Sequence, residues 1–113
     1  MPDLSIDREL LVEQLADLVR IDSTNPTLVP DGAGEAAVAE VVAAAMRDLG
    51  LEVDVWAPAP GRPNVVGVLP GTGGGRSLML NAHTDTVGVE GMDAPFTPRV
   101  EDGRMYGRGT QDM

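Results

Sequence analysis

Residues 35–56 read EAAVAEVVAAAMRDLGLEVDVW, and this stretch decides the fold class. Its first part, residues 35–49, is rich in alanine and begins with a glutamate, a composition that predicts a helix. Gly50 should end that helix, because glycine readily adopts the left-handed conformation that follows many helix ends. From residue 51 to Trp56 apolar and polar side chains alternate, which predicts a half-buried strand. A helix that leads directly into a strand indicates an α/β protein.

Another helix is predicted nearer the amino terminus. Asp7 is a typical N-cap, and the leucine and valine side chains of residues 8–20 recur at helical spacing. Pro26 and Pro30 break any continuing helix, because proline lacks a backbone donor. Residues 21–34 are therefore predicted to form a polar loop.

Two further apolar runs predict strands. They cover residues 64–69 and 77–82, and the glycine-rich residues 70–76 between them suit the connection of an antiparallel hairpin. These glycines do not make a Walker loop, which needs a lysine and a following helix. From His83 onward the chain is predicted mostly as loop, with a short extended piece at residues 104–106. Two helices and three or four strands predict an α/β fold with a mixed sheet flanked by helices.

The composition limits the classes of function. The chain has 113 residues, 18 acidic side chains against 8 basic ones, a net charge of −10 and no cysteine. Its length suits one domain, and the missing cysteines exclude a disulfide scaffold and thiolate metal ligands within these residues. The acidic balance and an aromatic content of only 3% argue against a nucleic-acid partner. No signal-peptide pattern and no apolar run of membrane-spanning length is visible, so we expect a cytoplasmic location and no membrane partner.

Three polar residues are candidates for chemistry. His83, the only histidine, follows the apolar residues 78–82, and Asp85 lies two positions later. A histidine at the end of a strand can give one ring nitrogen to a metal while a carboxylate accepts a hydrogen bond from the other. Asp112 follows Gly107 and Gly109, whose backbone freedom can direct its carboxylate at a cation. The residue types alone leave plainer roles open: an ordinary surface or core histidine, and a helix N-cap for Asp112.

Taken in order, several segments of the chain closely resemble the M20 metallopeptidase family. That family includes acetylornithine deacetylase, succinyl-diaminopimelate desuccinylase, aminoacylase and carboxypeptidase G-like enzymes. The segments are RIDSTNP at residues 20–26, Gly34-Glu35, LMLNAHTDTV at 78–87, APF at 94–96 and DGRMYGRGTQDM at 102–113. The resemblance extends from about residue 10 to residue 113, and the order of its motifs makes it specific.

The resemblance implies a partial zinc-exopeptidase-like catalytic domain with a two-zinc centre, with Co²⁺ or Mn²⁺ as alternative metals. His83 would ligate one zinc, and Asp112 would bridge both, since a carboxylate has two oxygens. Asp85 is the candidate catalytic residue that does not ligate: it would hold the imidazole in its ligating tautomer. The family's general-base glutamate and its remaining ligands come later in the sequence than Met113.

Residues 1–113 are accordingly expected to be the amino-terminal part of the catalytic domain, without the rest of that domain and without the family's lid and dimerisation domain. The expected function of the whole protein is zinc-dependent hydrolysis of amide bonds in N-acyl amino acids or short peptides, with a dipeptidase or carboxypeptidase as the alternative. The 113-residue piece alone is expected to be inactive. A homodimer is one expected state of the whole protein. The other hypothesis is a non-catalytic binding module that kept the fold.

Overall fold

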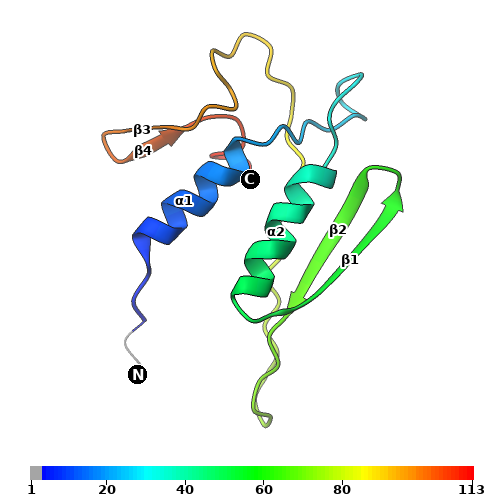
Figure 1. Ribbon diagram of the computed structural model, residues 1–113, viewed down its shortest axis with the longest axis vertical. Coiled ribbons are helices and arrows are strands. Elements are labelled where there is room, and N and C mark those ends of the chain that lie inside the picture. The colour runs from blue at the N-terminus through cyan, green and yellow to red at the C-terminus, as the bar shows by residue number, and fades with distance from the viewer. Residues whose placement is uncertain (1–3) are drawn as a thin grey trace.

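The structure is a computed structural model that describes residues 4–113, and within that range the chain forms two helices and two antiparallel strand pairs (Figure 1). In chain order the elements are α1 (Arg8–Val19), α2 (Ala36–Asp48), β1 (Glu52–Ala59), β2 (Arg62–Val68), β3 (Arg99–Glu101) and β4 (Arg104–Tyr106). This confirms the predicted α/β class, with the strands arranged as separate two-stranded sheets, β1–β2 and β3–β4. Outside these strands, an isolated parallel bridge joins Thr24 to Thr86.

Helix α1 begins where the sequence predicts. Asp7 has an extended backbone, and its Oδ1 accepts a hydrogen bond from the backbone amide of Leu10 at 3.0 Å. That bond satisfies one of the donors that every helix start leaves free. At the other end Val19 is buried, whereas the first turns of the helix are exposed. The carboxyl end of α1 is therefore the end that packs against the rest of the molecule.

Helix α2 ends at the predicted glycine. Gly50 has a φ of 83°, a conformation that other residues adopt only with strain. Its amide donates to the carbonyl of Arg47 at 2.9 Å, and the amide of Leu51 donates to the carbonyl of Met46 at 3.0 Å. This pair of bonds is a Schellman motif, which closes the helix and turns the chain directly into β1.

The small apolar core centres on α2, which packs against the β1–β2 hairpin (Figure 1), and also includes Val19 of α1. Val38, Ala39 and Ala43 of α2 are all buried. Gly67 of β2 allows the close approach, because a Cβ there would lie 2.8 Å from the sulfur of Met46. Small residues on both elements therefore let the helix and the hairpin come together.

The partner of the second strand differs from the prediction. Strand β2 pairs with β1 in antiparallel register, and residues 77–82 belong to no strand of the described range, so the predicted hairpin between residues 64–69 and 77–82 is wrong. Only Pro60 and Gly61 separate β1 from β2. Closing a two-residue connection costs less conformational entropy than closing the seven-residue, glycine-rich one. Gly61 permits the tight turn with a φ of 70°.

The extended piece predicted at residues 104–106 is confirmed as β4. It pairs with β3 through a turn at Asp102 and Gly103, which have φ values of 51° and 77°. Two consecutive positive φ angles define the type I′ turn that matches the twist of a short hairpin, and Asp-Gly is a preferred sequence for it.

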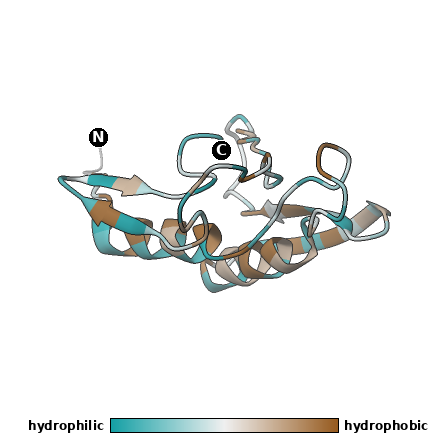
Figure 2. Cartoon of the chain, turned by 90° about the horizontal axis from the view of Figure 1, so that it is seen from above, coloured by the Kyte–Doolittle hydropathy of each residue, from teal (hydrophilic) through white to brown (hydrophobic). Residues whose placement is uncertain are grey.

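The described residues form a flat body of 50 × 39 × 20 Å. Seen from above, both helices run along one side of it, and loops cross the other side (Figure 2). Leu78, Met79 and Leu80 are 84%, 81% and 86% exposed, although they form the most apolar part of their segment. Neither helix of the described range has both the length and the apolar character of a bilayer-crossing segment.

Candidate metal site

The structure brings His83 and Asp112 together across 28 intervening residues. The Nε2 atom of His83 lies 2.9 Å from the Oδ1 atom of Asp112. Both side chains face solvent, with 47% of the His83 side chain and 78% of the Asp112 side chain exposed. The two predicted metal ligands therefore meet on an open surface rather than in an enclosed cavity.

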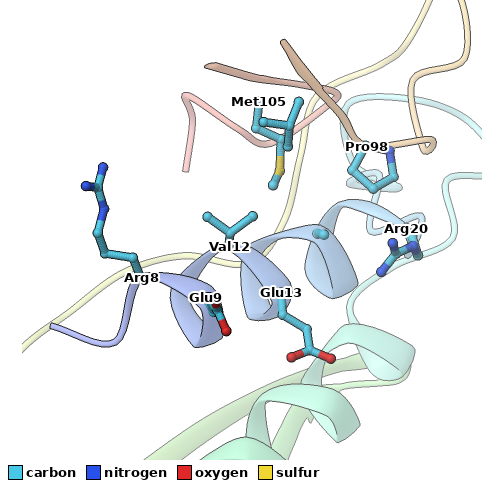
Figure 3. Close-up of a pocket in the computed structure, with 9 residues that line it drawn as sticks. Arg8, Glu9, Val12, Glu13, Arg20, Pro98 and Met105 are labelled. Carbon is cyan, nitrogen blue, oxygen red and sulfur yellow. The ribbon is translucent and has the colours of Figure 1, made fainter. Parts of the chain in front are cut away.

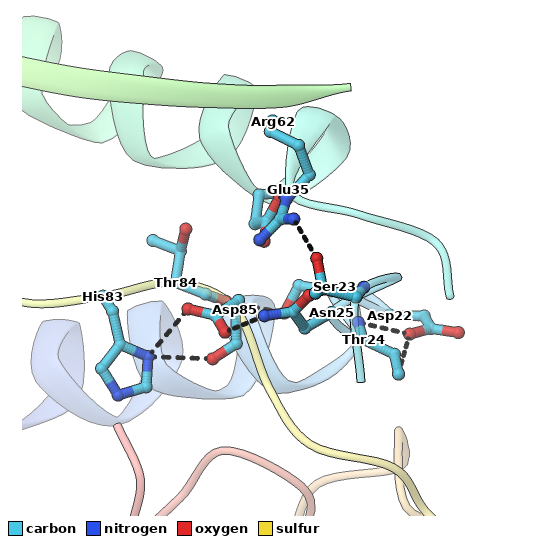
Figure 4. Close-up of polar contacts among 10 residues, drawn as sticks. Asp22, Ser23, Thr24, Asn25, Glu35, Arg62, His83, Thr84 and Asp85 are labelled. Carbon is cyan, nitrogen blue, oxygen red and sulfur yellow. Dashed lines mark hydrogen bonds and ion pairs between the residues drawn. The ribbon is translucent and has the colours of Figure 1, made fainter. Parts of the chain in front are cut away.

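The other imidazole nitrogen of His83 is held by Asp85 (Figure 4). Its Nδ1 atom lies 2.9 Å from the main-chain carbonyl oxygen of Asp85 and 3.3 Å from the carboxylate Oδ1. A carbonyl oxygen only accepts hydrogen bonds, so Nδ1 must carry a proton, and Nε2 is the nitrogen that can bind a cation. The sequence pattern predicted that the Asp85 carboxylate would contact the imidazole. The closer contact, made by the main-chain carbonyl of Asp85, has no signal in the sequence.

These contacts also set the charge of the ring. The hydrogen bond to the Asp85 carbonyl, followed by the one to the Asp112 carboxylate, raises the pKa of His83 above its ordinary value. When the ring is doubly protonated, its Nε2 proton faces the Asp112 carboxylate. A metal cation occupies the place of that proton when a histidine becomes a ligand, because only the deprotonated nitrogen coordinates.

The donor set fits a zinc ion in part. Two ligand atoms of one zinc ion, each at about 2.0–2.2 Å, lie within roughly 4.4 Å of each other, and the 2.9 Å between Nε2 and Oδ1 meets that condition. Imidazole nitrogen and carboxylate oxygen are ligands that zinc accepts. Catalytic zinc takes three protein ligands, and no group of three histidine, cysteine or acidic side chains gathers within residues 4–113. His83 and Asp112 would thus be two members of a larger ligand set.

The loop at residues 21–34 holds the segment next to His83 in place. Asn25 donates from Nδ2 to the Oδ2 atom of Asp85 at 2.9 Å, and its backbone amide donates to the carbonyl of Thr86 at 2.9 Å. The hydroxyl of Ser23 donates to the carbonyl of Thr84 at 2.8 Å. The loop and residues 84–86 therefore lie side by side, joined by backbone and side-chain hydrogen bonds (Figure 4). Sequence reasoning placed residues 20–26 among the resembling segments but missed Asn25, because nothing in its spacing reveals a partner 60 residues away.

A partly buried ion pair fixes the other side of this loop. Glu35, at the start of α2, is 5% exposed and pairs with Arg62 at the start of β2. The hydrogen bond to Glu35 raises the pKa of Arg62. The Nη1 atom of Arg62 also donates to the hydroxyl of Thr27 at 3.2 Å. Helix, hairpin and loop are thus tied together beside Asp85.

The segment that carries Asp112 is guided by glycines and one arginine. A Cβ on Gly107 would lie 2.5 Å from Cγ1 of Val19, so only glycine lets the chain pass this close to α1. Arg108 donates from its backbone amide to the carbonyl of Pro95 at 2.8 Å and from Nη2 to the carbonyl of Gly88 at 2.7 Å. These bonds bind the carboxyl-terminal segment to the loop that follows His83.

A depression lies elsewhere, between α1 and the β3–β4 hairpin (Figure 3). Its volume is about 570 Å³, and its lining includes apolar side chains such as Val12 and Met105 and charged ones such as Glu13 and Arg20. None of His83, Asp85 and Asp112 lines it. The candidate metal site is therefore separate from this depression.

Comparison with known proteins identifies the family. Residues 79–113 match the sequence profile of peptidase family M20/M25/M40, and this range contains His83, Asp85 and Asp112. Over 97% of its length the chain is 36% identical to an N-formyl-4-amino-5-aminomethyl-2-methylpyrimidine deformylase of Halalkalibacterium halodurans, of which it covers 29%. Over 89% of its length it is 34% identical to the Bacillus subtilis protein of the same name, of which it covers 25%. The chain thus spans less than a third of the length of these curated relatives, and it belongs to the M20 peptidase family.

Proposed function

We propose that residues 1–113 are the amino-terminal part of the catalytic domain of a longer, metal-dependent amide hydrolase. The observation that carries the proposal is the contact of the His83 Nε2 atom with the Asp112 carboxylate, while Nδ1 is held by Asp85. Family membership and two deformylase relatives support hydrolysis as the reaction class.

Each of the three residues has a proposed task. His83 offers Nε2 to a metal, and Asp112 offers two carboxylate oxygens that can hold a pair of ions. Asp85 keeps the proton on Nδ1, which leaves Nε2 free to ligate. Zinc is the proposed metal, in two copies, with Co²⁺ or Mn²⁺ as alternatives; when bound, such ions lower the pKa of water and polarise a scissile carbonyl.

The proposed substrate is a small molecule with an N-acyl group. The names of both relatives specify removal of a formyl group from an aminomethylpyrimidine, which makes an N-formyl amine the first substrate to test. N-acyl amino acids and short peptides are the second class, consistent with a deacylase, dipeptidase or carboxypeptidase. The net charge of −10 favours neither nucleic acid nor an anionic membrane surface as a partner. We propose a cytoplasmic location and a homodimer for the longer protein.

The test uses the longer protein. Removal of metal with a chelator should abolish hydrolysis of N-formyl amines, and added zinc should restore it. His83→Asn and Asp112→Asn should each lower the zinc content measured by elemental analysis. Each should also lower kcat/KM by at least about 10²-fold, because it removes one of the proposed metal ligands.

Glu90→Gln serves as the matched control, since it removes one exposed negative charge from the same loop without touching His83. It should keep wild-type activity and zinc content. Full activity of the chelated protein, or of both ligand variants, would overturn the assignment. A folded protein without zinc and without turnover on any N-acyl amine would instead support the binding-module alternative.

A further inference from the structure

We propose that Asn25 is the positioning residue that aims the Asp85 carboxylate at His83, an inference that rests on the proposed function. The two oxygens of Asp85 have one contact each. Oδ2 accepts a hydrogen bond from the Asn25 Nδ2 atom at 2.9 Å, and Oδ1 lies 3.3 Å from the Nδ1 atom of His83. A carboxylate held at one oxygen can no longer rotate freely, so Asn25 determines where the other oxygen points.

Asn25 is itself fixed in only one orientation. Its Oδ1 atom accepts a hydrogen bond from the backbone amide of Thr27 at 2.8 Å. A flipped side-chain amide would set its NH₂ group against that donor and its oxygen against the Asp85 carboxylate, losing both hydrogen bonds. The backbone amide of Asn25 also donates to the carbonyl of Thr86 at 2.9 Å. Two further contacts of Asn25 therefore set the position of the donor that meets Asp85.

The surroundings give Asp85 a competing partner. Arg62 lies close enough for the Asp85 charge to contribute to the raised pKa of its guanidinium. Arg62 contacts Glu35 and Thr27, and the Thr27 amide in turn donates to Asn25. Without the Asn25 hydrogen bond, the Asp85 carboxylate is free to turn away from His83 toward this cation. Asn25 thus keeps Asp85 on the imidazole side.

The neighbouring Ser23 provides a matched control. Like Asn25, it ties the amino-terminal loop to residues 84–86, through its hydroxyl and the Thr84 carbonyl at 2.8 Å. It makes no contact with the Asp85 carboxylate. A merely structural role for Asn25 predicts equal effects of Asn25→Asp and Ser23→Ala, whereas a positioning role predicts an effect of Asn25→Asp alone.

The experiment measures the imidazole of His83 and zinc binding separately in the longer protein. Imidazole ¹⁵N resonances of the metal-free protein, recorded above the pKa of His83 and assigned by their loss in His83→Gln, report the tautomer. We expect the Nδ1-protonated tautomer in the wild type and in Ser23→Ala. In Asn25→Asp the main-chain carbonyl of Asp85 still accepts from Nδ1, but the carboxylate no longer adds to that contact, so we expect a tautomer mixture with a larger fraction of the Nε2-protonated form than in the wild type. The zinc dissociation constant should rise about 10–100-fold in Asn25→Asp and stay near the wild-type value in Ser23→Ala.

Asn25→Ala, which removes the donor without adding charge, should show the same tautomer mixture and covers the case in which Asn25→Asp fails to fold. Wild-type tautomer and affinity in either folded Asn25 variant, or an equal loss in Ser23→Ala, would overturn the positioning role. A wild-type protein that binds no zinc would overturn the proposed function instead, and the tautomer measurement would still decide the role of Asn25.

Discussion

Gly107 shows how one residue controls the path of the chain to the candidate metal site. Its position leaves no room for a side chain, since a Cβ would lie 2.5 Å from Val19 Cγ1 and 3.3 Å from the Pro95 carbonyl oxygen. Carbon atoms that are not bonded approach each other to about 3.5–4.0 Å. Any larger residue must therefore push the segment off α1, and Asp112 lies only five residues further along.

We predict that Gly107→Ala lowers the free energy of unfolding by about 1–3 kcal/mol and weakens zinc binding through displacement of Asp112. Denaturant unfolding and zinc titration measure the two effects. Gly75→Ala is the control, because a Cβ at Gly75 meets nothing within 4 Å; its effect should stay within about 0.5 kcal/mol. Similar losses for both variants would show that the contact with Val19 is not the cause.

At the same scale, the resemblance of the ordered motifs predicted that His83, Asp85 and Asp112 lie together, and the structure places both aspartates in contact with the imidazole; their metal-binding roles stay a prediction. Asn25 could not be predicted in the same way, since its contact with Asp85 depends on how a distant loop folds back. The close main-chain contact of the Asp85 carbonyl with His83 was likewise invisible, because backbone acceptors have no residue signature. Side-chain chemistry is thus readable from the sequence, while the hydrogen bonds that orient it depend on the fold.

At the scale of elements, the predictions were most accurate where local signals agree. Asp7 marks the start of α1 and Gly50 follows the end of α2, and both helices span nearly the expected residues. The prediction of strand pairing was wrong because pairing depends on contacts between distant residues. By its composition alone, the run at residues 64–69 could pair with either neighbouring strand. The two-residue connection through Gly61 decides in favour of β1.

This corrected pairing can be tested with a cross-strand disulfide. Val55 and Val65 are directly opposite in the β1–β2 register, and the chain has no cysteine of its own. We predict that Val55→Cys with Val65→Cys forms a disulfide under mild oxidation, because opposite residues on paired strands lie within bonding reach. Mass spectrometry after thiol alkylation gives the yield. Val65→Cys with Asn81→Cys, which the rejected hairpin would place directly opposite each other, should stay reduced; the reverse pattern would restore the original pairing.

At the scale of the whole molecule, the apolar residues 78–80 stand out because they are exposed. Leu78, Met79 and Leu80 are each more than 80% accessible, and no strand of the described range pairs with them. An unpaired apolar segment is a template for another strand. In the proposed longer protein, further sequence is the expected partner of this segment.

We predict that the backbone amides of residues 77–82 exchange with solvent deuterium rapidly in the 113-residue chain and slowly in the longer protein. Pairing with a strand protects amides, because exchange then requires local opening. Amides of β1 that are already bonded to β2 are the internal reference and should be protected in both samples. Rapid exchange of residues 77–82 in the longer protein would contradict the pairing.

The contact between positions 83 and 112 also closes a ring of chain that contains the whole β3–β4 hairpin. An ion bound by both residues would act as a reversible cross-link. Closing a flexible segment into a loop removes conformational entropy roughly in proportion to the logarithm of its length. The rate at which a protease cleaves this segment in limited digestion should then fall as the fraction of protein with bound metal rises. Trypsin can attack there, since Arg99, Arg104 and Arg108 all lie within the ring.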